Sequence, residues 1–190
     1  MTIGVLALQG AFRAHRNKLS DLGVDTLEVR TPQHLDDVDA LVMPGGESTT
    51  MSMLLESSGL FDPVAARLSD GMAVLGTCAG LILLSSEIED GRPDQRCFAR
   101  FDAAVLRNGY GRQIDSFETE LDVDGMDGPV HAVFIRAPRL TRVGTSVEVL
   151  ASSDDDPVLI REGTALAAAF HPELSQDARI HRLFLDSIAY

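Results

Sequence analysis

The chain has 190 residues, of which 45% are hydrophobic and 24% are charged. This composition excludes an intrinsically disordered chain, and apolar runs of only a few residues exclude a membrane-spanning one. Its 29 acidic and 16 basic side chains give a net charge of −13. Nucleic acid is an unfavourable partner for such a chain, because its binding depends on basic patches. A protein partner, a small substrate and a merely solvated acidic surface all remain open.

The cysteines and the first residues indicate where the protein works. Two cysteines are too few for a disulfide framework, and no C-x-x-C pair is present. The opening stretch, MTIGVLALQG, lacks the features of a signal peptide and is typical of a first buried strand. We therefore expect a cytoplasmic protein. No linker or repeat divides the sequence, so we expect a single domain over residues 1–190.

The first half of the chain alternates between apolar runs and helical patterns. The apolar runs predict strands at 3–8, 25–29, 39–44 and 72–77. Apolar residues at helical spacing predict helices at 12–23, from Ser48 onward, and at about 79–86. This order predicts an α/β fold of three layers, in which helices cover both faces of a mostly parallel central sheet.

The second half is richer in short strands. After an expected loop at 94–100, apolar runs separated by turn residues predict strands at 101–108, 117–123, 130–136, 147–151, 157–162 and 165–170. We expect these short strands to form antiparallel hairpins at the edge of the sheet and then a return to its centre. An amphipathic pattern at 179–189 predicts a closing helix.

Cys78 lies in the stretch VLGTCAGLILL, between a predicted strand and a predicted helix. The small residues Gly76, Ala79 and Gly80 allow the sharp turn of a nucleophile elbow. At the start of a helix, unpaired N–H groups and the helix dipole favour thiolate over thiol. The pattern fits two interpretations, a catalytic nucleophile or a small buried side chain at a strand end.

His171 is the candidate base for this nucleophile. It follows the apolar run ALAAAF, at the carboxyl end of a predicted strand, where open α/β sheets build their sites. Glu173 can accept a hydrogen bond from the second ring nitrogen, as the third member of a triad does. Alone, the pair also fits a surface histidine beside a solvated glutamate. No metal-ligand spacing relates the remaining histidines, which we interpret as background: His15, His34, His131 and His181.

An acyl-transfer site also needs donors for the developing oxyanion. The N–H of Ala79 and the Gly45-Gly46 turn in MPGGESTT are the two candidates. A phosphate loop is disfavoured because no G-K-[ST] step follows the glycines, whereas a plain turn remains open. Arg107, in RNGYGRQ, fits either a contact to a polar substrate or a solvated hairpin turn.

These segments resemble a known family. GTCAGL and HPEL are similar to the class I (triad) glutamine amidotransferases. LALQGAF, PGGEST, GRQ-x-DSFE and FIRAP resemble, more specifically, the glutaminase subunits of pyridoxal 5'-phosphate synthase, the PdxT/SNO family. The resemblance extends nearly from end to end of the chain.

The resemblance implies an enzyme that hydrolyses L-glutamine to L-glutamate and ammonia. Cys78 would attack the side-chain amide, His171 would shuttle the proton, and Glu173 would orient His171. Gly46 and Ala79 would form the oxyanion hole. The resemblance implies neither a cofactor nor a metal. The glutamine-binding positions that it implies are Gly46, Glu47, Ser48, Arg107, Ile135 and Arg136.

The resemblance also implies a partner. Ammonia would be channelled to a synthase subunit that makes pyridoxal 5'-phosphate (vitamin B6) from a pentose phosphate and a triose phosphate. In the family that subunit forms a dodecameric ring with glutaminases docked outside, and docking activates them. Gln9 and Gly10 are the candidates for an interface-linked element, because LALQGAF is expected at a strand end near the site.

Some residues depart from the family pattern. Residues 94–110 differ from the usual sequence, with Gly109 and Tyr110 where a small residue and Phe are commoner.

Three further functions stay open. A glutaminase of another pathway would carry the same triad, although RNGYGRQIDSFE and FIRAP argue against it. A stand-alone cysteine hydrolase and a non-catalytic interaction subunit are also compatible with parts of the pattern.

Overall fold

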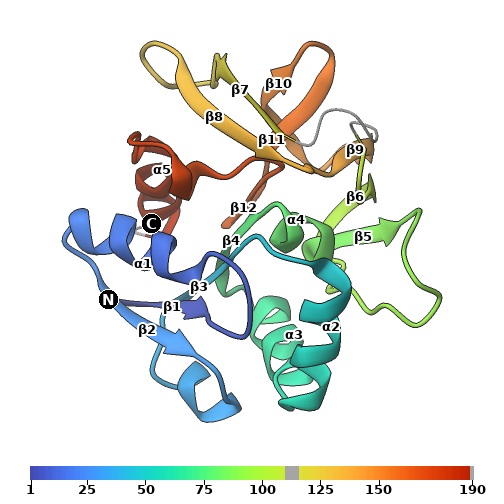
Figure 1. Cartoon of the computed structure of the whole chain (residues 1–190). Coiled ribbons are helices and arrows are strands. Elements are labelled where there is room, and N and C mark those ends of the chain that lie inside the picture. Colours follow the sequence, from blue (N-terminus) through green and yellow to red (C-terminus); the bar gives the residue numbers. More distant parts are fainter. Residues whose placement is uncertain (110–115, 189–190) are drawn as a thin grey trace.

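The fold is described from a computed structural model of the chain, in which residues 1–109 and 116–188 are placed well enough to describe. Its centre is a seven-stranded sheet of order β10-β11-β12-β4-β3-β1-β2 (Figure 1). The bounds of these strands are β1 Thr2–Leu6, β2 Asp25–Val29, β3 Ala40–Met43, β4 Ala73–Thr77, β10 Glu148–Ser153, β11 Asp156–Glu162 and β12 Ala165–Ala168.

Most neighbours in this sheet are parallel. β2, β1, β3, β4 and β12 pair in parallel, whereas β11 joins β12 and β10 in antiparallel fashion. Two smaller sheets complete the described strands. One contains β5 (Ser85–Ile88), β6 (Phe101–Leu106) and β9 (Arg139–Val143), and the other pairs β7 (Ser116–Leu121) with β8 (Val130–Ile135). The prediction of a mostly parallel sheet with short antiparallel strands is confirmed.

Helices cover both faces of the central sheet. α1 (Phe12–Asp21) and α5 (Arg179–Ile188) lie on one side, and α2 (Ser48–Ser57), α3 (Phe61–Ser69) and α4 (Ala79–Leu84) lie on the other (Figure 1). Because both faces are covered, the central strands are mostly apolar, and every residue of β3 and β4 is buried. The three-layer prediction is therefore confirmed.

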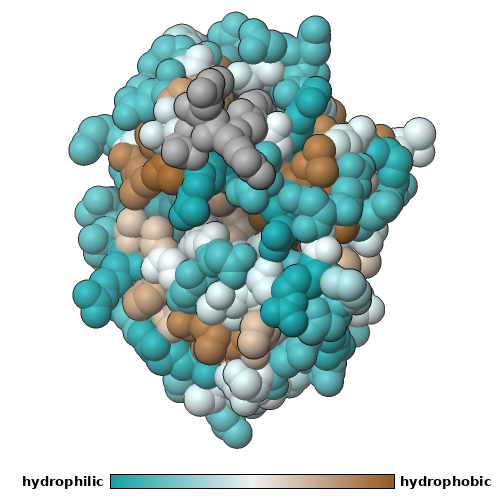
Figure 2. All heavy atoms as spheres, turned by 45° about the vertical axis from the view of Figure 1, so that its right-hand side comes forward, coloured by the Kyte–Doolittle hydropathy of each residue, from teal (hydrophilic) through white to brown (hydrophobic). Residues whose placement is uncertain are grey.

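The outer surface contrasts with this core. The face shown in Figure 2 is mostly hydrophilic, and apolar residues occur on it only in small groups. None of the helices within 1–109 and 116–188 is long and apolar enough to cross a membrane.

The observed elements differ from the predicted ones in three places. The helix predicted at 79–86 ends at Leu84, because the chain from Ser85 pairs with β6. α3 was not predicted, although Phe61, Val64 and Leu68 form its buried face at helical spacing. β9 was not predicted either, since its alternating residues are largely exposed and only its pairing with β6 makes it a strand.

The close packing of α4 on β3 generates a testable prediction. A Cβ atom on Gly80 would lie 2.1 Å from the carbonyl oxygen of Met43, so one of the two backbones would have to move. We expect Gly80→Ala to lower the free energy of unfolding by about 3 kcal/mol in chemical denaturation.

Gly23→Ala is the matched control. No heavy atom lies within 4 Å of a Cβ there, but φ is +78°, so only backbone strain of about 1 kcal/mol is expected. Equal losses in the two variants would contradict the steric explanation.

Candidate active site

Cys78 occupies the turn between β4 and α4. Its φ of 50° and ψ of −103° lie in a region that residues other than glycine rarely adopt. Its backbone N–H donates to the carbonyl oxygen of Ala168 on β12, at 2.8 Å. Strained backbone of this kind is typical of nucleophile elbows. Gly76 allows close packing below the turn, because a Cβ there would lie 2.9 Å from the backbone carbonyl carbon of Gly80.

His171 and Glu173 follow the neighbouring strand, β12. Because β4 and β12 are parallel neighbours, their carboxyl ends bring His171 next to Cys78. The N–H of His171 donates to the Val133 carbonyl at 2.8 Å, which ties the segment to β8. Glu173 lies in the short 3-10 helix Pro172–Leu174 and is buried.

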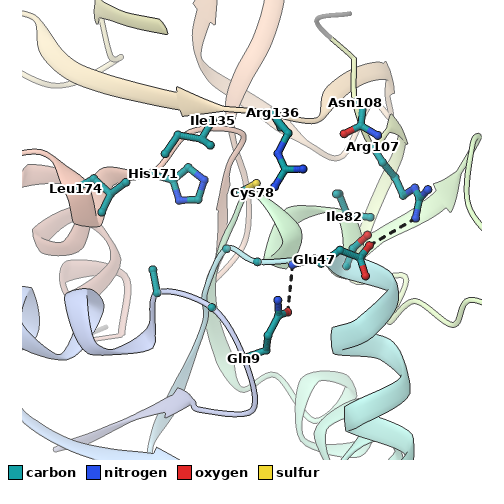
Figure 3. Close-up of a pocket in the computed structure, with 15 residues that line it drawn as sticks. Gln9, Glu47, Cys78, Ile82, Arg107, Asn108, Ile135, Arg136, His171 and Leu174 are labelled. Carbon is teal, nitrogen blue, oxygen red and sulfur yellow. Dashed lines mark hydrogen bonds and ion pairs between the residues drawn. The ribbon is translucent and has the colours of Figure 1, made fainter. Parts of the chain in front are cut away.

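The three side chains lie next to one another, and Glu173 is hydrogen-bonded to His171. Glu173 Oε1 lies 2.7 Å from His171 Nδ1. Cys78 interacts with the same imidazole and contributes to the raised pKa of His171. Figure 3 shows the Cys78 and His171 side chains close together at one end of the pocket. The structure thus brings together the three residues that the sequence nominates as a triad, while their catalytic roles stay a prediction.

The electrostatics of the pair favour an imidazolium next to a carboxylate. Burial disfavours the charged form of His171, but hydrogen bonds and charge interactions with Cys78 and Glu173 outweigh it and raise its pKa to about 10. Burial also disfavours the Glu173 carboxylate, yet interactions with His15 and His171 hold the pKa of Glu173 below its usual value. His171 is therefore equipped to hold a proton beside the thiol.

A cavity of about 430 Å³ opens above Cys78. This volume is at the small end of ligand pockets and suits a small molecule. Residues from several separate loops and strand ends line it (Figure 3): Gln9, Gly10, Ala11, Gly45, Gly46, Glu47, Ser48, Cys78, Ile82, Arg107, Asn108, Ile135, Arg136, His171 and Leu174.

Most predicted site residues lie on this cavity, and two do not. Glu173 lies behind His171, away from the cavity. Ala79 is the first residue of α4, where backbone N–H groups have no partner within the helix. Arg136, at the end of β8, has a φ of 41°, and its side chain points towards Cys78 (Figure 3).

Glu47 uses its carboxylate within the fold. Oε1 accepts from the N–H of Thr49 at 3.1 Å, and Oε2 accepts from the N–H and the hydroxyl of Thr50, both at 2.7 Å. Partial burial opposes ionisation, but the hydrogen bonds from Thr50 and Thr49 hold the pKa of Glu47 below its usual value. The carboxylate therefore caps α2, and Arg107 Nη1 lies 3.8 Å from it.

Gln9 and Gly10 support the Gly45-Gly46 turn. Gln9 Oε1 accepts from the N–H of Glu47 at 3.1 Å. A Cβ on Gly10, whose φ is +86°, would lie 1.7 Å from the carbonyl oxygen of Gly45. Only glycine fits there. These contacts place both residues at the cavity, and their link to a partner interface stays a prediction.

Two buried histidines that the sequence pattern did not single out lie behind the site. His15 Nε2 is 3.3 Å from Glu173 Oε2 and 3.1 Å from Thr77 Oγ1, and His15 Nδ1 is 2.9 Å from His181 Nε2. Burial lowers the pKa of His15, with Glu173 opposing this effect, and burial lowers the pKa of His181 to about 3. Helical spacing was the sequence signal that could have identified His15 as buried, since His15 and Leu19 form the buried face of α1.

The segment that departs from the family pattern is only partly described. A Cβ on Gly109 would lie 2.0 Å from Arg139 Cβ, so glycine is required at this position. Tyr110 and residues 111–115 of the GRQIDSFE stretch lie outside the described residues. Across 1–109 and 116–188, no group of three or more His, Cys, Asp or Glu side chains is arranged to hold a metal ion.

The fold and the site define an α/β protein with a cysteine at a strand-to-helix elbow and a His-Glu pair after the adjacent parallel strand. This is the architecture of a cysteine-dependent acyl-transfer enzyme. The chain belongs to the SNO glutamine amidotransferase family, whose profile matches residues 5–190.

Known proteins agree with this assignment. A pyridoxal 5'-phosphate synthase subunit PdxT from Mycobacteroides abscessus is 56% identical over 98% of this chain and 96% of its own. The protein of the same name from Herpetosiphon aurantiacus is 53% identical over 97% and 99%, respectively. A crystal structure described as a glutamine amidotransferase superposes with a TM-score of 0.93, at 49% identity and 99% coverage of both chains.

The depressed pKa of His181 predicts acid sensitivity. Between pH 6.5 and about 3 the unfolded chain protonates this histidine and the folded protein does not, so stability falls as the pH falls. His181→Gln removes the titration and keeps an N–H donor. Between pH 7 and pH 4.5, the free energy of unfolding should fall by about 2 kcal/mol more in the wild type than in the variant.

Denaturant unfolding at both pH values measures this difference. His181→Gln is the reference, and His34→Gln, which replaces a histidine outside the buried cluster, is the control that should follow the wild type. Parallel pH profiles for wild type and His181→Gln would contradict the prediction.

Proposed function

We propose that this glutamine amidotransferase hydrolyses L-glutamine to L-glutamate and ammonia at Cys78. The observation that supports this most directly is the grouping of Cys78, His171 and Glu173 at a cavity of about 430 Å³, in a chain of the SNO family. We also propose that residues 1–190 act as one glutaminase domain.

The reacting state pairs a Cys78 thiolate with a protonated His171, and the raised pKa of His171 favours the protonated imidazole. The thiolate attacks the side-chain amide carbon of glutamine and forms a tetrahedral intermediate. His171 then donates its proton to the leaving nitrogen, so that the C–N bond breaks, ammonia departs and a glutamyl thioester remains. Water, deprotonated by His171, hydrolyses the thioester and regenerates the thiol. Glu173 holds the imidazole in the tautomer that both proton transfers need.

The oxyanion and the substrate each have assigned partners in this proposal. The N–H groups of Ala79 and Gly46 stabilise the negative oxygen. Arg136 and Arg107 are the cavity cations available for the substrate α-carboxylate. The remaining glutamine-binding positions that we propose, through backbone groups, a hydroxyl or apolar contact, are Gly46, Glu47, Ser48 and Ile135.

We propose that the ammonia passes to a synthase subunit that makes pyridoxal 5'-phosphate from a pentose phosphate and a triose phosphate. The support is the name of relatives such as the Mycobacteroides abscessus subunit. A dodecameric synthase ring with glutaminases docked outside, linked to the site through Gln9 and Gly10, is the assembly that we propose. The two free cysteines fit a reducing compartment, and we propose the cytoplasm.

The test measures glutamate formed from glutamine, with and without the synthase subunit of the same organism. We expect the synthase subunit to stimulate the wild type. Cys78→Ser and His171→Asn should each lower kcat of the complex by roughly a thousandfold, since each removes a group that takes part in bond formation or proton transfer.

Cys97→Ser is the matched control, because Cys97 is the other free cysteine and does not line the cavity. It should retain the wild-type rate. No stimulation by the synthase subunit, together with full activity in Cys78→Ser, would overturn the proposal.

A further inference from the structure

We infer that His15 is a positioning residue for Glu173 and His171: its imidazole lies against the second oxygen of the Glu173 carboxylate, with Nε2 3.3 Å away, and holds that oxygen in place. The inference rests on the proposed function, in which Glu173 orients His171. It assigns a task to a buried titratable group on α1 that the three-residue mechanism does not use.

Glu173 has one satisfied and one unsatisfied oxygen. Oε1 is bonded to His171 Nδ1 at 2.7 Å. Oε2 is buried, and within the described part of the chain no group meets it with full hydrogen-bond geometry. His15 Nε2 lies 3.3 Å from it, and the hydrogen-bond partner of this nitrogen is Thr77 Oγ1, at 3.1 Å. A buried carboxylate oxygen left without a donor is costly, so a proton on this nitrogen stabilises the carboxylate in one rotamer.

His181 determines where the His15 proton lies. His181 Nε2 is 2.9 Å from His15 Nδ1, whereas the other nitrogen of His181, Nδ1, is buried without a partner among the described residues. If His181 donates its Nε2–H to His15 Nδ1, His15 carries its own proton on Nε2. The unpaired Nδ1 of His181 then carries a lone pair and no proton. The opposite tautomers would leave a buried N–H unpaired on His181 and direct the lone pair of His15 Nε2 at the carboxylate. The first arrangement is therefore favoured.

Thr77 extends the same contact to the nucleophile. Its hydroxyl oxygen lies 3.1 Å from His15 Nε2, and it directly precedes Cys78. One imidazole thus bridges the end of β4, which carries the nucleophile, and the 3-10 helix that carries Glu173. Movement of α1 would change the position of both segments.

His15 does this as a neutral donor. Burial lowers its pKa, and the titratable groups that face it are Glu173, His171 and His181. A protonated His15 would place a second positive charge near the imidazolium of His171 and would disfavour it. A neutral His15 orients the Glu173 carboxylate without adding a positive charge.

The test compares two substitutions of similar length. His15→Gln places an amide N–H near the position of Nε2, and His15→Met places a thioether there with no donor. We expect His15→Met to lower kcat of the activated complex by roughly 10- to 100-fold with little change in KM, because the bond positions a reacting group. His15→Gln should recover most of the loss.

A second readout does not depend on turnover. In ¹⁵N NMR titrations of the free protein, the pKa of His171 should fall in His15→Met and return towards the wild-type value in His15→Gln. Leu19→Met, a buried change one turn away on the same helix, should leave both kcat and this titration unchanged. Denaturant unfolding verifies that every variant is folded.

The outcomes separate this inference from the proposed function. Wild-type kcat and His171 titration in His15→Met, or equal losses in the Met and Gln variants, would overturn the positioning role. Full glutaminase activity in Cys78→Ser would overturn the proposed function instead, and the NMR titration would still test the coupling of His15 to His171.

Discussion

The site depends on the parallel pairing of β4 with β12. The N–H of Cys78 donates to Ala168 on β12 at 2.8 Å, so Cys78 and the segment that carries His171 start from adjacent, hydrogen-bonded backbone. Because the two strands are parallel, both chain segments leave the sheet at the same edge. A hydrophobic core buried on both faces holds this pairing, and the precision of the site follows from the rigidity of the sheet.

Polar groups behind the cavity extend this rigidity. Thr77, His15 and His181 form a buried series that contacts Glu173 from the side opposite His171. Buried polar side chains that contact one another restrict one another's arrangement. Glu47 acts similarly at the cavity rim, where its carboxylate caps α2. Much of the polar side-chain chemistry near the site therefore supports the positions of other residues.

Local patterns predicted a large part of this arrangement. The strand, the small residues and the apolar helix around Cys78 are contiguous, so the elbow was visible in the sequence, as was the strand end before His171. Contacts between distant segments were not visible. β9 is a strand only because β6 lies beside it, and His15 meets Glu173 only because α1 packs against the 3-10 helix after β12. Periodicity identifies the buried face of α1 but not what that face contacts.

The position of α5 has a consequence for synthesis of the protein. His181 lies on this last helix of the described chain, whereas its partner His15 lies on the first. β12, His171 and Glu173 also come late in the sequence. While the segment from β12 to α5 is still inside the ribosome, a nascent chain contains Cys78 but neither His171 and Glu173 nor His181 behind them. The three residues of the candidate site and the histidines behind them therefore come together only after the segment up to α5 has emerged.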